Sequence, residues 1–158
     1  MIVIKYISPD DWMQWREMRL SALGDAPYAF SSLLRDWQDE GEQRWRNRLA
    51  EVSVNVIANL HGRDAGMVSG MSFDQEVELL SMWVAPFARG LGVGDELVNT
   101  IIQWTFSQEK PRLILRVQTG NDRAAALYVR HGFEYPSPSE GDADAHEARE
   151  RLMVRTQT

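Results

Sequence analysis

The sequence of 158 residues contains no cysteine. This absence excludes disulfide bonds, thiolate metal sites and a cysteine nucleophile. The sequence also lacks any run close to the roughly 18 apolar residues that a membrane-spanning helix requires. The apolar run at residues 1–5 is too short for a signal peptide. We therefore expect a cytoplasmic protein without a membrane partner.

The sequence has no excess of basic residues either. Lysine and arginine number 17 against 23 aspartate and glutamate residues, and the formal net charge is −6 at pH 7. Nucleic-acid phosphates repel a negatively charged protein, so we expect no nucleic-acid partner, and the charge favours cationic small molecules. The three histidines, His61, His131 and His146, do not form a metal-ligand pattern, and no metal cofactor is expected.

Repeats and low-complexity linkers are absent too, which predicts one domain over residues 1–158. Strand patterns occur at residues 2–7, 52–60, 67–73, 77–84, 113–117, 133–135 and 149–156. Helical spacing of apolar residues occurs at residues 11–23, 34–50, 95–106 and 122–130. This order predicts an α/β domain in which about four helices flank a mixed, mostly antiparallel sheet of seven strands.

A glycine-rich turn at residues 84–95 is the most informative stretch. It places Arg89, Gly90, Gly92 and Gly94 between an apolar run and an amphipathic segment. Glycine permits positive φ, and the amides at a helix N-terminus bind anions. The spacing matches neither the dinucleotide fingerprint nor the P-loop, although another kind of nucleotide-binding domain remains an alternative. The local pattern indicates a strand, a phosphate-binding turn and a helix, or a turn that serves the fold alone.

Two motifs taken together resemble a known family. The first is Met82-x-Val84-x-Pro86-x-x-Arg89-x-x-Gly92-x-Gly94, and it resembles the acyl-CoA signature of the GCN5-related N-acetyltransferases (GNAT). The second is Asn121-x-x-Ala124-x-x-Leu127-Tyr128-x-x-x-Gly132-Phe133, and it resembles the second cofactor motif of that family. The order of the elements before residue 75 also fits, so the resemblance covers the whole chain, with residues 79–133 as its specific part.

The resemblance implies acetyl-CoA as the acyl donor. The amides of the glycine turn would hold its pyrophosphate, with added charge from Arg89. The fourth and fifth strands would splay apart, and the pantetheine arm would pair with backbone groups near Met82 and Val84. The implied cofactor-binding residues are Met82, Trp83, Val84, Arg89, Gly90, Leu91, Gly92, Val93, Gly94, Asp95, Asn121, Ala124 and Tyr128. A helix N-cap for Asn121 and a core position for Tyr128 are the structural alternatives.

The resemblance also implies direct transfer of the acetyl group to a bound primary amine. An alkyl amine is mostly protonated at pH 7 and must lose a proton to attack a thioester. Tyr128 is the expected general acid, which protonates the leaving sulfur. Glu78 is the expected general base, which acts through water from a face shared with Leu80, Met82 and Val84, while Ser81 has the opposite alternation. An exposed carboxylate without a role is the alternative for Glu78.

The acceptor site is expected between the first two helices and the polar loop at residues 136–145. The candidate lining residues are Arg16, Arg19, Tyr28 and Phe30. Two arginines suit a carboxylate on an amino acid or peptide, whereas the net negative charge suits a polyamine or aminoglycoside. The tryptophans before residue 50 either pack the core or line this pocket. A homodimer is expected because dimers are frequent in the family, and an acyl-CoA-binding sensor without turnover is the alternative function.

Overall fold

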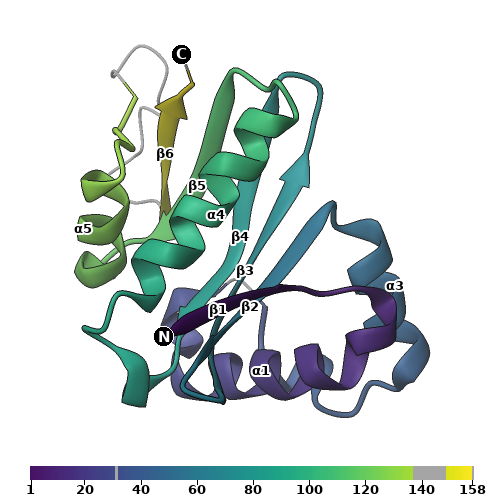
Figure 1. The fold of residues 1–158 in the computed structure, drawn as a ribbon. Helices are drawn as coiled ribbons and strands as arrows, with labels where there is room; N and C mark the ends of the chain where they lie inside the picture. The colour runs from purple at the N-terminus through teal and green to yellow at the C-terminus, as the bar shows by residue number, and fades with distance from the viewer. Residues whose placement is uncertain (31, 137–148, 158) are drawn as a thin grey trace.

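A six-stranded mixed sheet runs through the centre of the computed structural model, which describes residues 1–30, 32–136 and 149–157 (Figure 1). Its strands lie side by side in chain order. They are β1 (Ile2–Tyr6), β2 (Val54–Leu60), β3 (Arg63–Ser72), β4 (Glu76–Val84), β5 (Arg112–Gln118) and β6 (Glu150–Thr156). The helices are α1 (Trp12–Asp25), α2 (Leu34–Trp37), α3 (Glu42–Glu51), α4 (Val93–Ser107) and α5 (Asp122–Arg130). All neighbouring strands pair antiparallel except β4 and β5.

Two details of the predicted order are wrong. The described residues form six strands rather than seven, because the segment 133–135 contributes a single bridge between Glu134 and Val154. Pro136 follows directly, and a proline has no N–H with which to continue the ladder. The helix predicted over residues 34–50 is two helices, α2 and α3. Gly41 breaks it, because its extended backbone forms the N-cap of α3.

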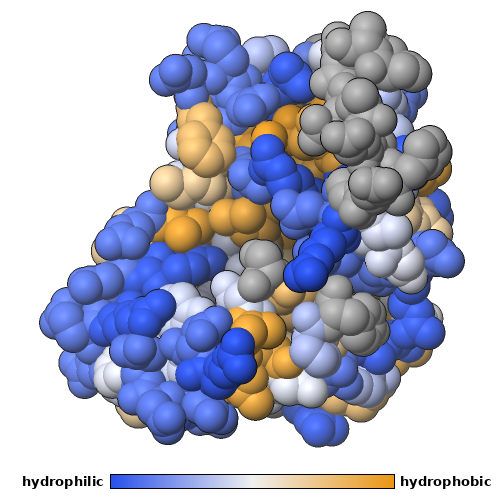
Figure 2. Space-filling view, turned by 180° about the vertical axis from the view of Figure 1, so that it is seen from behind, coloured by the Kyte–Doolittle hydropathy of each residue, from blue (hydrophilic) through white to orange (hydrophobic). Residues whose placement is uncertain are grey.

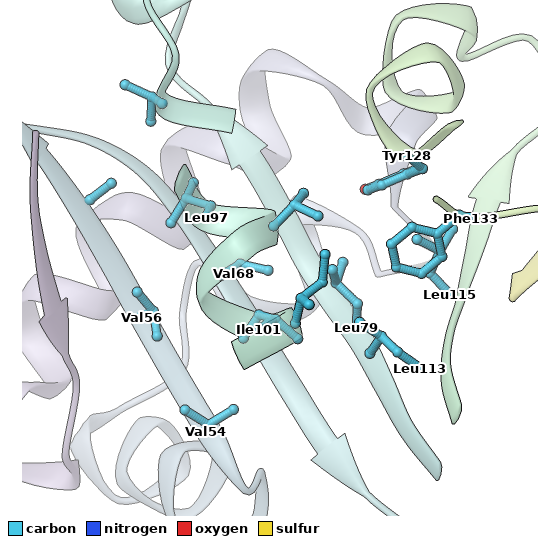
Figure 3. Close-up of a cluster of buried hydrophobic side chains, with 14 of the residues drawn as sticks. Val54, Val56, Val68, Leu79, Leu97, Ile101, Leu113, Leu115, Tyr128 and Phe133 are labelled. Carbon is cyan, nitrogen blue, oxygen red and sulfur yellow. The ribbon is translucent and has the colours of Figure 1, made fainter. Parts of the chain in front are cut away.

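Helices cover both faces of the sheet. On one face α4 buries an apolar stripe that includes Leu97 and Ile101 against β2, β3 and β4, and α5 adds Tyr128 beside β5 (Figure 3). On the other face α1 and α3 bury Trp15 and Trp45, each 0% exposed. Among the described residues no helix is both long and apolar enough to cross a membrane.

The parallel pair β4–β5 is short. The two strands are in register only at Glu76–Arg112, Val77–Leu113 and Glu78–Ile114. Beyond Glu78, β4 keeps its pairing with β3 and has no partner on the β5 side. The splay expected between the fourth and fifth strands is therefore confirmed, and it leaves β4 without a strand partner on the β5 side at residues 79–84.

A β-bulge interrupts β4 in the splayed part. The register with β3 shifts so that Ser81 and Met82 together oppose Val68, and Ser81 adopts a φ of 56°. A bulge adds one residue and reverses the alternation of side chains after it. Met82 and Val84 consequently pack on the α4 face with Leu79. The expected grouping of Glu78 with Met82 and Val84 is therefore wrong, because Glu78 alternates with Leu79 and lies on the opposite face.

Gly66 on β3 allows α4 to approach the sheet. A Cβ at this position would lie 2.9 Å from Leu97 Cδ1 and 2.9 Å from the carbonyl oxygen of Trp83. The carbonyl belongs to the neighbouring strand and cannot turn away. We expect Gly66→Ala to lower the free energy of unfolding by about 1–3 kcal/mol. The matching loss in Tm is roughly 2–4 °C per kcal/mol for a domain of this size.

The control for this experiment is Gly24→Ala in α1. A Cβ there meets only Leu34 Cδ2 at 4.0 Å, which is an ordinary contact. Alanine also has the higher helix propensity, so this variant is expected to keep or raise Tm. Thermal unfolding followed by circular dichroism measures both. Equal stability of the Gly66→Ala variant and the wild type would contradict the close approach of α4.

Candidate active site

A groove of about 1560 Å³ lies where β4 and β5 diverge. Its walls are the splayed part of β4, the glycine turn before α4, the end of β5, the first turns of α5, and side chains of α1 and α3. Figure 2 shows the back of the molecule narrowed between an upper and a lower part, with hydrophobic side chains exposed at the narrowing. Typical small-ligand pockets measure about 300–1,000 Å³. The groove therefore has room for a large ligand and a second, smaller one.

The glycine turn lies at one end of the groove and begins α4. Gly90 and Gly92 have φ angles of 78° and 90°, and Gly92 is the N-cap of α4. The first amides of a helix have no intrahelical acceptor, and a glycine N-cap offers no side-chain oxygen in their place. The amides are therefore available to a phosphate, which the helix dipole also favours.

The third motif glycine has a packing role. Gly94 lies inside α4, and a Cβ on it would be 3.2 Å from Leu127 Cδ2 and 3.6 Å from Val84 Cγ2. Its absent side chain lets α5 and β4 close on the start of α4. Two neighbouring residues that were predicted to bind the cofactor, Leu91 and Val93, do not line the groove. Leu91 is 58% exposed, and Val93 is buried in the core beneath α4.

Arg89 lines the groove, but its hydrogen bonds are to the protein. Its Nη2 donates to Asp25 Oδ2 at 2.7 Å, and its Nε donates to the carbonyl of Val84 at 3.1 Å. The Trp83 indole donates to the same carboxylate at 3.0 Å. Together the Trp83 indole and the Arg89 guanidinium lower the pKa of Asp25. Arg89 thus ties the turn to α1, and its contribution to pyrophosphate binding stays a prediction.

The second motif begins α5. The Asn121 side chain accepts a hydrogen bond from the amide of Ala124 at 3.3 Å, so the expected N-cap is confirmed. One turn further along, Tyr128 is 5% exposed and packs its edge on Phe133, with ring centroids 5.7 Å apart. Its side chain points from α5 towards β4, with the hydroxyl group at the end nearer β4, and it lines the groove (Figure 3). Burial raises the pKa of Tyr128, which keeps the phenol protonated at neutral pH.

Charged pairs stand around these groups. Glu78 accepts a hydrogen bond from Arg116 Nη1 at 2.7 Å, and its side chain is 16% exposed. Asp95 in the first turn of α4 accepts from His131 Nε2 at 2.8 Å and from Arg130 at 2.9 Å. These two contacts lower the pKa of Asp95. Glu78 is therefore a carboxylate at the groove wall that Arg116 holds in one orientation.

The structure brings some of the expected acceptor residues together. Arg19 and Phe30 both line the groove, and the Arg19 guanidinium carbon lies 4.6 Å from the Phe30 ring centroid. Arg16 donates to Glu17 at 3.1 Å and does not line the groove. The Tyr28 side chain and nearly all of the loop predicted over residues 136–145 lie outside the described residues. Three of the tryptophans before residue 50 both line the groove and pack in the α1–α3 core, namely Trp15, Trp37 and Trp45. The two roles proposed for these tryptophans are therefore compatible.

Two residues of the site, Arg48 and Arg116, were not expected from the sequence. Arg48 on α3 donates to the hydroxyls of Ser69 and Ser81 at 3.2 Å each, and Arg116 pairs with Glu78. Ser81 thus faces α3, contrary to the alternation expected for it. A signal for Arg48 existed, since it shares the buried helix face of Trp45 and Leu49. Arg116 carried a similar signal as the charged residue within an apolar strand.

Three comparisons relate the chain to known proteins. The sequence matches the model of the acetyltransferase (GNAT) family over residues 12–133. The spore coat polysaccharide biosynthesis protein SpsD of Bacillus subtilis is 34% identical over 103 residues, which span 64% of this chain and 36% of that protein. The chain therefore spans about a third of the length of this curated relative.

Two solved structures share the fold. The PaiA N-acetyltransferase from Thermoplasma acidophilum, in complex with coenzyme A, aligns with a TM-score of 0.78 at 14% identity and 99% coverage of both chains. A GNAT-family acetyltransferase from Streptococcus pneumoniae aligns with a TM-score of 0.76 at 22% identity and full coverage of both chains. At these identities the likeness concerns the fold.

Proposed function

The chain belongs to the GNAT acetyltransferase family, and from this premise we propose that it transfers an acetyl group from acetyl-CoA to a primary amine of a small molecule or peptide. One observation carries the proposal. A helix N-terminus suited to phosphate, an unpaired strand edge and a buried tyrosine line one groove. The whole chain, residues 1–158, would form this one acetyltransferase domain.

The chain's own groups fit acetyl-CoA. The amides of α4 from Gly92 to Asp95 would hold the pyrophosphate, and the backbone edge at Met82 and Val84, which no strand covers, would pair with the pantetheine arm. When bound, acetyl-CoA supplies the thioester whose acyl carbon the amine attacks. Asn121 and Ala124 would close the other side of the arm. The glycine turn leaves room for this approach, since a Cβ on Gly90 would meet nothing within 4 Å.

Two side chains are proposed to move protons. Glu78 takes, through a water molecule, the proton that the amine loses as the new C–N bond forms. Tyr128 donates its phenolic proton to the sulfur as the C–S bond breaks. Arg116 keeps the Glu78 carboxylate in place at 2.7 Å. The splay brings both residues to one groove, although they come from β4 and α5.

An acyl-CoA-binding sensor without turnover is the second candidate. The glycine turn would serve it equally well, but it needs neither a buried phenol nor a carboxylate at the groove wall. These two groups favour the enzyme. The expected cytoplasmic location and homodimer stay predictions.

The proposal is tested in two steps on the full chain. Acetyl-CoA at 100 times its Kd should stabilise the fold by about 2.7 kcal/mol. Thermal unfolding measures this gain, and protection by ATP or NAD without protection by acetyl-CoA would contradict it. Release of free CoA thiol is then followed with a panel of amino acids, peptides, polyamines and aminoglycosides. Amino sugars join the panel because one relative is named for polysaccharide biosynthesis. Binding without any turnover would favour the sensor.

A further inference from the structure

Two arginines at the α1–α3 end of the groove lack an ionic partner. Arg19 on α1 and Arg48 on α3 both line it, and neither forms an ion pair with a carboxylate of the described residues. The hydrogen bonds of Arg48 go to neutral oxygens, those of Asn55, Ser69 and Ser81. Arg19 lies over the Phe30 ring. Three other arginines of the groove behave differently, since Arg89, Arg116 and Arg130 each pair with a carboxylate within 2.9 Å.

Both guanidinium groups stay charged at this position. Burial, and after it the charge of Arg48, lowers the pKa of Arg19 to about 10. Burial also lowers the pKa of Arg48 to about 10, although the nearby charge of Glu51 acts in the opposite direction. A group with a pKa near 10 is a cation at pH 7. The protein therefore keeps two neighbouring, partly buried cations without an ion pair among the described residues, an arrangement that costs more free energy than an ion pair in the same place.

Unpaired donors mark the same place. Within the described residues, two buried side-chain atoms lack a hydrogen-bond partner, Trp15 Nε1 and Arg19 Nη1. They are one helical turn apart on α1, and both residues line the groove. Buried polar atoms nearly always have a hydrogen-bond partner. Two buried donors without an acceptor, close to two cations, are therefore typical of a site that binds an anion. A carboxylate has two oxygens and can accept from both donors.

The charge of the groove agrees with this pattern. Six arginines and four acidic residues line it within the described part of the chain, whereas the whole sequence carries −6. Among the described residues, the side chains that line the groove thus carry more positive than negative charge, although the whole chain is negative. The expectation of a polyamine or aminoglycoside was based on the net charge of the whole chain, and the charges of the described groove residues do not support it.

Resting on the proposed acetyltransfer, we infer that the acceptor is a small amine that also carries a carboxylate, and that Arg19 binds this carboxylate. Arg48 adds positive potential behind it and holds the β4 bulge through Ser81. The amine then points to the splay, where Glu78 and Tyr128 stand. Arg19 is a specificity residue in this arrangement and takes no part in proton transfer.

The experiment uses matched amine pairs. L-amino acids, β-amino acids and ω-amino acids are compared with the amines that lack their carboxylate, such as phenylalanine with phenethylamine, in the thiol-release assay. We expect the wild type to favour a carboxylate-bearing amine. Arg19→Gln should raise its KM at least tenfold, which is the loss of one hydrogen bond between charged groups. The KM for acetyl-CoA and the turnover of the carboxylate-free amine should stay the same.

A stability measurement separates a binding role from a structural one. Because Arg19 is a partly buried cation without an ion pair among the described residues, Arg19→Met and Arg19→Gln should leave Tm equal or raise it. A structural arginine would give the opposite sign. Arg46→Gln is the matched control, since Arg46 lies on α3 outside the groove and pairs with Asp10 and Glu42. It should leave the KM values of both amines unchanged.

Each other outcome overturns the inference. These are a lower Tm in both Arg19 variants, an equal loss with both amines of a pair, a wild-type preference for the carboxylate-free amine, and no turnover of any carboxylate-bearing amine. Failure of the proposed function looks different, because then no amine of either kind releases CoA thiol, whether or not acetyl-CoA protects the wild type from heat.

Discussion

Replacing Tyr128 by phenylalanine is expected to lower kcat by about 10²- to 10⁴-fold, the usual contribution of a general acid. The variant keeps the ring that packs on Phe133 and removes only the hydroxyl. The fold and the KM for acetyl-CoA should therefore be unchanged. Steady-state thiol release at saturating amine measures the effect, and a kcat within about threefold of the wild type would remove Tyr128 from the mechanism.

The pH profile provides a second readout for the same group. An ordinary tyrosine has a pKa of 10.0, and burial raises that of Tyr128. The phenol therefore keeps its proton to a higher pH than an ordinary tyrosine, and kcat of the wild type should show no loss from its ionisation up to about pH 9. The control is Tyr6→Phe, since Tyr6 is 57% exposed on β1 and lies outside the groove. This variant should match the wild type in kcat at every pH.

Replacing Gly92 by alanine is expected to weaken acetyl-CoA binding by about 10- to 100-fold. The N-cap of α4 has a φ of 90°, and alanine in that region is strained. If the turn relaxes, the amides of Val93 and Gly94 no longer converge on the groove. Loss of one hydrogen bond to a charged group costs about 1.5–3 kcal/mol, which gives the stated range. Isothermal titration with acetyl-CoA measures it.

Gly62 supplies a control with the same backbone strain. It lies in the β2–β3 turn with a φ of 88°, and a Cβ there would meet nothing within 4 Å. A Cβ on Gly92 would meet only Ile2 Cδ1 at 3.9 Å. Both substitutions should thus lower Tm by a similar amount, and only Gly92→Ala should change the Kd. Equal Kd values in the two variants would show that the turn does not hold the pyrophosphate.

Local patterns account for the parts of the fold that the sequence predicted. The apolar spacing at residues 95–106 and the glycines before it depend on neighbours within a few positions. They placed α4 and the glycine turn before it close to where the structure has them. The two motifs also identified the family, because Asn121 and Tyr128 stand at fixed distances along α5. Element ends were less accurate, and the break at Gly41 was missed since helical spacing continues on both sides of it.

Contacts between distant residues account for what could not be predicted. Arg89 and Asp25 are 64 positions apart, and only the packing of α1 beside the glycine turn makes them partners. The pairing of Arg116 with Glu78 likewise depends on the short parallel register of β4 and β5. Period-two alternation contains no information on either contact, because it describes one strand at a time.

The sequence by itself determined the α/β order of elements, the glycine turn and the presence of a tyrosine on the helix that follows β5. Only the tertiary structure decided which way the splayed half of β4 faces and which cations remain unpaired. The bulge at Ser81 reverses the side-chain alternation, and a bulge depends on the strands and helices packed around it. Arg19 and Arg48 become a candidate anion site because α1 and α3 bring them to one groove and no carboxylate of the described residues forms an ion pair with either.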